Sequence, residues 1–193
     1  MSEDNRMSNE LTLKGPRLAF PDLFVPTAFK EGQPLQYGAV FLIPKGSDME
    51  KQVNDAITRV ATEKWGKQAE AVLKSIKPVP QSFCFMDGDN KTNLDGYEGH
   101  MALSSKNKRR PTVVDADASP LTKDDERPYA GCYVVAKVEI WAQQNEHGKA
   151  VRCSLLGVQF YRDGDSFSAG RVSSADEFED LSDEGNTDTS TLL

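Results

Sequence analysis

Cysteine and histidine are scarce in this sequence, which limits the chemistry that its side chains can perform. Among its 193 residues there are 3 cysteines and 2 histidines. The cysteines (Cys84, Cys132 and Cys153) form no CxxC pair, and neither histidine completes a zinc-binding pattern with them. We therefore expect no structural zinc site, and the odd number of cysteines favours a reduced, intracellular protein.

Long apolar runs are also missing. No stretch approaches the roughly 18 consecutive apolar residues of a membrane span. The N-terminal MSEDNRMSNE is polar and has no apolar core of a signal peptide. The sequence thus predicts a soluble, cytoplasmic protein without a membrane partner.

Catalytic motifs are absent as well. The sequence contains no GxSxG elbow, P-loop, HExxH pair or dinucleotide-binding glycine pattern. A loop at 86–98 resembles a calcium loop, but Lys91 occupies a ligand position and Thr92 replaces the required glycine. We therefore expect neither an enzyme nor a cofactor or metal ion.

Charge is distributed unevenly along the chain. The formal net charge is -7, from 30 acids and 23 Lys and Arg. Residues 175–193 contain seven of the acids and no Lys or Arg, which leaves 23 acids against 23 bases in residues 1–174. The body is therefore neutral, and all of the excess negative charge belongs to the C-terminal tail.

Hydrophobic periodicity predicts a mainly β protein with one main α-helix. Strands are expected at 11–24 (interrupted by Gly15-Pro16 and ended by Pro21), 37–43, 100–105, 131–142 and 151–161. A helix is predicted over 48–64, where Ser47 and Glu50 form a capping box, and a second helical piece over 69–76. Gly157 predicts a bulge. Five strands and a helix favour a small OB-fold-like barrel.

A dense basic cluster follows the strand at 100–105. We call it the basic rim; it consists of Lys106, Lys108, Arg109 and Arg110. On the strand at 131–142, alternation places Tyr133, Lys137 and Trp141 on the face opposite the core. Single strands of nucleic acid are bound by cations that contact phosphates and by aromatic rings that stack on bases. The sequence therefore predicts DNA binding, and the candidate residues are Lys106, Lys108, Arg109, Arg110, Tyr133, Lys137, Trp141, Arg152, Tyr37 and Tyr129.

Other interpretations of the same residues stay open. The basic rim can be a solvated loop, and Trp141 can pack beneath the hairpin. The acidic tail can serve only for solubility, or it can imitate a strand of phosphates, compete for the basic groove and recruit partner proteins. A segment of this composition cannot bury enough apolar surface to fold alone, so we expect disorder there.

Several segments resemble a family of tailed-phage single-stranded DNA-binding proteins. They are FPDLF, YGAVFLIPK, GYEGHMALSSKNKRRPTVVD, PYAGCYVVAKVEIWA and LLGVQFYRDGD, in this order, spanning about residues 11–170. The resemblance implies an OB-fold, non-specific binding of single-stranded DNA in phage replication, recombination or repair, and an acidic C-terminal tail, through which we expect contacts with replication proteins. Many acidic-tailed phage proteins of this kind end in an aromatic residue, whereas this sequence ends in Leu192-Leu193.

Taken together, the sequence predicts three parts. Residues 1–9 form a disordered arm, residues 10–172 form an OB-fold domain that binds single-stranded DNA, and residues 173–193 form the acidic disordered tail. The main alternative is an acidic DNA mimic that inhibits a host nuclease or DNA-binding protein. A single-stranded RNA chaperone is a further alternative, because stacking alone does not distinguish the sugars.

Overall fold

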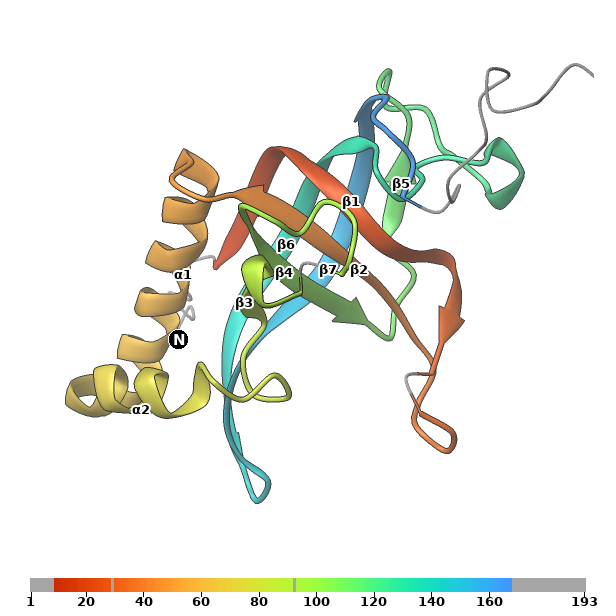
Figure 1. Cartoon of the computed structure of the whole chain (residues 1–193). Helices are drawn as coiled ribbons and strands as arrows, with labels where there is room; N and C mark the ends of the chain where they lie inside the picture. The colour runs from red at the N-terminus through yellow and green to blue at the C-terminus, as the bar shows by residue number, and fades with distance from the viewer. Residues whose placement is uncertain (1–8, 29, 92, 168–193) are drawn as a thin grey trace, which may run out of the picture.

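Long β-strands form the frame of the molecule, and two helices lie together on one side of it (Figure 1). This computed structural model describes residues 9–28, 30–91 and 93–167; most of the expected arm and all of the expected tail lie outside them. The main elements are β1 (Glu10–Thr27), β2 (Gln36–Pro44), α1 (Asp48–Trp65), α2 (Ala69–Ile76), β3 (Phe85–Asp87), β4 (His100–Asn107), β5 (Thr112–Val114), β6 (Tyr133–Asn145) and β7 (Gly148–Arg162).

Five of the described strands close into a barrel. β1 pairs with β2 and with β6, β2 pairs with β4, and β6 pairs with β7, all antiparallel. A parallel pairing of β4 with β7, at Lys106 and Ser154, completes the ring. The short strands β3 and β5 pair with β4 and β7. The prediction of a mainly β, five-stranded OB-fold-like barrel with one main helix is confirmed.

Strand β1 is longer than predicted, because its prolines lie at irregularities of the ladder. Its first part pairs with β6 and its second part with β2. Gly15 and Pro16 fall in a register shift, where Gly15 has a φ of +101° that glycine adopts readily. Pro21 falls in a second shift, between Ala19 and Asp22. The expectation that Pro21 ends the strand was wrong, since its missing N–H interrupts the ladder only locally.

The helix α1 confirms the predicted cap and apolar stripe. Ser47 caps it, with its hydroxyl accepting from the Glu50 backbone N–H at 3.3 Å. The buried stripe consists of Val53, Ala56, Ile57, Val60, Ala61 and Trp65. Trp65 is 9 % exposed, and its Nε1 donates to Gln144 Oε1 of β6 at 2.9 Å. The indole therefore joins the helix to the barrel.

The main core fills the barrel and continues under the helices. Along β6, Val134, Ala136, Val138 and Ile140 are fully buried, which confirms the predicted alternation. The predicted bulge at Gly157 is also present, as a register shift between β6 and β7. No helix in the described part of the chain is long and apolar enough to cross a membrane.

A second, smaller apolar cluster lies outside the barrel, on the face formed by β1, β2 and β4. It contains Ala19, Leu42, Ala102 and Tyr97, the last from the loop at 88–99. The base of this loop is held by Lys45, which pairs with Asp87 at 2.6 Å and with Asp89. Hydrogen bonds from Lys45 lower the pKa of both carboxyl groups. The acids of the calcium-like loop thus bind a lysine, and this lysine fixes the loop against the barrel.

Candidate nucleic-acid interface

A row of paired residues runs around the outside of the barrel at the level of Lys106. The strand register pairs Asp22 of β1 with Gly38 of β2, and Gly38 with Lys106 of β4. Lys106 is paired with Ser154 of β7, and Ser154 with Glu139 of β6. Residues paired directly across neighbouring strands share one face of the sheet. Lys106 therefore lies between β2 and β7 in the sheet, and the β1–β2 and β6–β7 hairpins both extend toward the bottom of the view in Figure 1.

Trp141 is brought close to Lys106 by the closure of the barrel. Its indole Nε1 donates to Ser154 Oγ at 2.9 Å, and Ser154 is the residue of β7 that pairs with Lys106. Trp141 is half-buried and pairs across the hairpin with the exposed Arg152. The Arg152 Nε in turn donates to Gln143 Oε1 at 2.6 Å. Trp141, Arg152 and Lys106 therefore lie on three neighbouring strands, β6, β7 and β4.

A small hollow opens on the other side of Lys106. Its volume is about 170 Å³; we call it the Tyr37 hollow, and it is lined by Asp22, Thr27, Gln33, Pro34, Gln36, Tyr37, Gly38 and Lys106. A Cβ on Gly38 would lie 3.2 Å from the backbone oxygen of Ser105, a tight contact. Because Gly38 has no side chain, the hollow stays open between Tyr37 and Lys106.

The rest of the basic rim follows directly after β4 and is exposed. Asn107 anchors it: its Nδ2 donates to the Leu155 backbone oxygen at 2.9 Å, and its Oδ1 accepts from the Arg109 N–H at 2.9 Å. The Arg110 guanidinium lies 5.7 Å from the centre of the Phe24 ring. Lys108, Arg109 and Arg110 form no ion pair with a carboxylate among the described residues. Their charges remain available to an anionic ligand.

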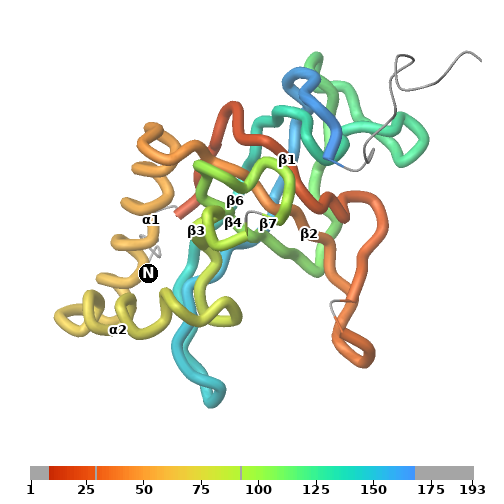
Figure 2. The backbone as a smooth tube through the Cα atoms, viewed as in Figure 1, coloured from red at the N-terminus to blue at the C-terminus, as the bar shows by residue number. Residues whose placement is uncertain are grey.

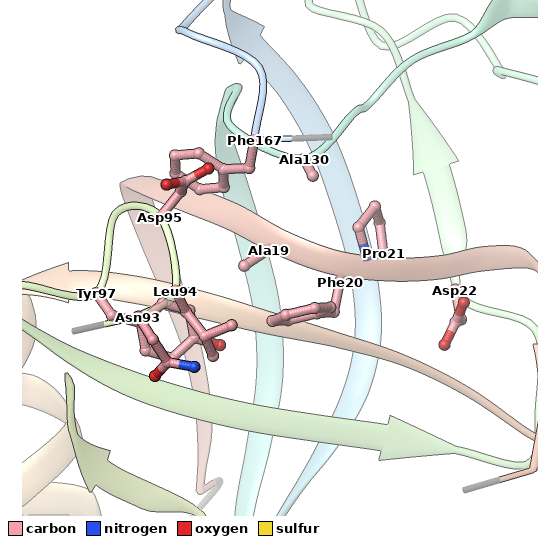
Figure 3. A pocket seen from close by; sticks show the side chains of 10 residues that line it. All are labelled: Ala19, Phe20, Pro21, Asp22, Asn93, Leu94, Asp95, Tyr97, Ala130 and Phe167. Carbon is pink, nitrogen blue, oxygen red and sulfur yellow. The ribbon is translucent and has the colours of Figure 1, made fainter. Parts of the chain in front are cut away.

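A larger hollow lies further along β1 (Figure 3). Its volume is about 460 Å³; we call it the Phe20 hollow, and it is lined by Ala19, Phe20, Pro21, Asp22, Asn93, Leu94, Asp95, Tyr97, Ala130 and Phe167. Phe20 is 57 % exposed, and its ring lies 6.4 Å from that of Tyr97 in an edge-on arrangement. Asp22 borders both hollows, so they adjoin.

Two predicted DNA-binding residues of β6 lie away from this face. Tyr133 stands eight positions before Trp141, roughly 26 Å at about 3.3 Å per residue. Its ring is flanked by Arg162 at 4.4 Å and Arg17 at 5.5 Å from the ring centre. Lys137 is exposed between them, opposite Gly157. The structure therefore does not gather Tyr133 with Trp141, and DNA contacts by Tyr133 and Lys137 stay predictions.

Tyr129, another predicted residue, holds the end of β7 in place. Its hydroxyl donates to Asp163 Oδ1 at 2.7 Å and accepts from the Gly164 N–H at 3.1 Å. Burial, together with the bond to Asp163, raises the pKa of this phenol. The ring also packs against the barrel core. These contacts give Tyr129 a structural role, and a contact with DNA stays a prediction.

The sequence analysis did not single out Phe20 or Tyr97, which both line the Phe20 hollow. Phe20 belongs to the apolar segment LAFPDLF, in which a regular strand would assign its ring to a face by simple alternation. The irregularity between Ala19 and Asp22 changes that assignment. The available signal was Pro21, which marks a departure from a regular ladder.

A comparison with protein families shows which family the chain belongs to. The model described as "Enterobacter phage Enc34, ssDNA-binding protein" matches residues 9–189. The chain belongs to this family. The resemblance to phage single-stranded DNA-binding proteins that the sequence motifs indicated is thereby confirmed. "Putative protein p50" of Acyrthosiphon pisum secondary endosymbiont phage 1 is 49 % identical over 175 residues, which cover 90 % of this chain and 94 % of that protein.

Solved structures agree with membership of the Enc34 family at the level of the fold. The single-stranded DNA-binding protein from bacteriophage Enc34, in complex with ssDNA, matches with a TM-score of 0.71 and 23 % identity, covering 83 % of this chain and 90 % of that one. The single-stranded DNA-binding protein gp2.5 of bacteriophage T7 matches with a TM-score of 0.54 and 16 % identity, covering 88 % and 94 %.

Proposed function

We propose that the protein binds single-stranded DNA, without sequence preference, across the outer face of β2 and β4. The observation that carries this proposal is the position of Lys106, between the Tyr37 hollow and Trp141, with the basic rim at the end of the same strand. In barrel order β2 and β4 are the second and third strands, which form the ligand face of OB-folds together with the first and last hairpin loops.

The chemistry of this face suits a flexible, anionic strand. Lys106, Lys108, Arg109 and Arg110 neutralise phosphates, and the released counterions make the affinity fall with salt. Trp141 and Tyr37 offer rings to bases, and stacking accepts any base because each has a π-face. Arg152, beside Trp141, adds charge where the strand leaves over the β6–β7 hairpin.

Membership of the Enc34 family and the charge of the chain support the biological role that we propose. The protein coats and protects single strands during phage DNA replication, recombination and repair. The acidic tail competes with DNA for the basic face when DNA is scarce, and it recruits replication proteins when DNA displaces it. The charge asymmetry between the neutral body and the tail supports this competition.

The rim can be tested with two triple variants that remove the same charge. The first combines Lys108→Ala, Arg109→Ala and Arg110→Ala. The control combines Lys51→Ala, Lys64→Ala and Lys67→Ala, which are exposed residues on the helix side. Because each lost phosphate contact lowers the slope of log affinity against log salt by roughly 1, the rim variant should bind a labelled oligothymidine more weakly and with a shallower slope.

Fluorescence anisotropy across a salt series measures both quantities. The control should keep the affinity of the unmodified protein to within about twofold, since exposed charges distant by more than a Debye length of roughly 10 Å are screened. Equal losses in the two variants would mean that net charge, and not the rim, drives binding.

A further inference from the structure

Phe20 combines two features that are unfavourable for a bulky apolar residue. Its φ is +46°, in the left-handed region, where a bulky side chain is a rare exception. Its ring is 57 % exposed, and it belongs to neither apolar cluster of the described residues. Strained residues persist where the surrounding structure holds them, and they concentrate at binding sites. The strain and the exposure of Phe20 together indicate a role in binding a ligand.

The walls around Phe20 are aromatic and well supported. Tyr97 is 3 % exposed and packs with Leu42 and Ala102, so its ring is fixed. Phe167 closes the upper side in the view of Figure 3. A Cβ on Gly96 would lie 2.3 Å from Phe167 Cζ, so a side chain at this position would displace the Phe167 ring. The hollow is thus shaped before any ligand enters.

The charges at the edge of the Phe20 hollow favour a neutral aromatic ligand. Asp22 and Asp95 line it, and Asn93 adds an amide. Two carboxylates repel phosphate, but they accept hydrogen bonds from the amino and imino groups of nucleobases. An anionic backbone would therefore stay outside, over Lys106, while a base turns inward. This arrangement separates phosphate contacts from base contacts on one face.

We propose that the Phe20 hollow receives one unstacked nucleobase of the bound strand, with Phe20 as the stacking residue. This rests on the proposed function: Asp22 borders both hollows, so a strand crossing Lys106 continues from the Tyr37 hollow into the Phe20 hollow. The strained backbone keeps the ring out of the core and turned toward the ligand. A nucleobase that stacks on the Phe20 ring would cover the apolar surface that is exposed in the absence of DNA.

Three substitutions at Phe20 separate the ring from the strained backbone. Phe20→Ala removes the ring and keeps a Cβ at the same φ, whereas Phe20→Gly removes the ring and also relieves the strain. Phe20→Tyr keeps the aromatic face. Tyr161→Ala is the control, because Tyr161 is an exposed aromatic residue (41 %) that lines neither hollow.

The affinity for oligothymidine should fall about 5- to 150-fold in both Phe20→Ala and Phe20→Gly, the loss expected for one stacked base. Phe20→Tyr and Tyr161→Ala should stay within about twofold of the unmodified protein. Oligonucleotides that carry 2-aminopurine report stacking directly, and the fluorescence change on binding should be smaller in the two ring-deleted variants. Thermal melting should show Phe20→Gly at least as stable as Phe20→Ala, and melting of both above the assay temperature excludes unfolding as the cause of weak binding.

The outcomes distinguish this inference from the proposed function. If the unmodified protein binds and the rim variant is weakened, but Phe20→Ala and Phe20→Gly bind normally, the nucleobase site is overturned and the DNA-binding face stands. If Tyr161→Ala loses as much as Phe20→Ala, the hollow has no special role and the inference is likewise overturned. If the unmodified protein does not bind at low salt, both fail.

Discussion

At the scale of single residues, position along a strand decides which outward side chains act together. Alternation places Tyr133 and Trp141 on the same face of β6, and the structure confirms the inward face of that strand. Trp141 nevertheless adjoins Lys106 through Ser154, whereas Tyr133 is enclosed by two guanidinium groups. Two guanidinium groups therefore already lie against the Tyr133 ring, whereas the Trp141 indole is held at its nitrogen by Ser154.

Trp141 should therefore contribute more to binding than Tyr133. We expect Trp141→Ala to weaken oligothymidine binding by about 1–3 kcal/mol, the usual value for one stacked base. Tyr133→Ala should cost less, because its ring supports Arg17 and Arg162. Titrations of both variants measure the difference.

The intrinsic fluorescence of the two tryptophans gives an independent control. Trp65, the last residue of α1, is buried against the barrel, so DNA should quench only Trp141, and Trp141→Phe should abolish the quenching. Quenching that persists in Trp141→Phe would place the base contacts elsewhere.

At the scale of elements, the two helices cover one side of the barrel core, and the face proposed to bind DNA lies on β2 and β4 (Figure 1). The contact of Trp65 with Gln144 couples α1 to the hairpin end of β6, three residues after Trp141, whereas Lys108, Arg109 and Arg110 follow a different strand. This division predicts that changes at the helix affect stability more than binding.

Trp65→Phe tests that separation. It removes the indole hydrogen bond and some packing, and we expect the free energy of unfolding to fall by about 1–2 kcal/mol. The affinity for DNA should not change. Urea unfolding and anisotropy measure the two quantities on the same sample. A large loss of affinity in the folded variant would contradict the independence of the helix side and the DNA-binding face.

Local patterns predicted some elements well and others poorly, for physical reasons. The capping box and the stripe defined α1, and alternation defined the core face of β6, because both signals lie within one segment. The end of β1 was missed, since whether Pro21 interrupts a ladder depends on the bulge in which it lies. The short strands β3 and β5 carry too few residues to show a period.

The site was predicted in part for the same reason. The basic rim and Trp141 are visible as charge density and as an outward aromatic residue. Their meeting depends on the parallel pairing of β4 with β7, a contact between distant segments that no local pattern encodes. The Phe20 hollow includes residues of the loop at 88–99, whose base is held by Lys45, directly after β2, through Asp87 and Asp89, a contact between distant segments.

At the scale of the whole molecule, the chain carries a cluster of positive charge, the basic rim, and a cluster of negative charge near its C-terminus. The basic rim follows β4, and the seven acids of residues 175–193 lie beyond the barrel in sequence, outside the described residues. A binder of phosphates that carries its own polyanion should show an affinity reduced by internal competition. This competition follows from charge and does not require a defined structure of the tail.

The most direct test of DNA binding is fluorescence anisotropy of a labelled oligothymidine across a salt series. The full chain is compared with a chain that ends at Ser174. We predict tight binding that weakens steeply with salt, and a higher affinity at low salt for the shortened chain, because the competing acids are gone. Absence of binding by both chains at low salt would contradict the account, and an inhibitor of a host DNA-binding protein would then become the leading explanation.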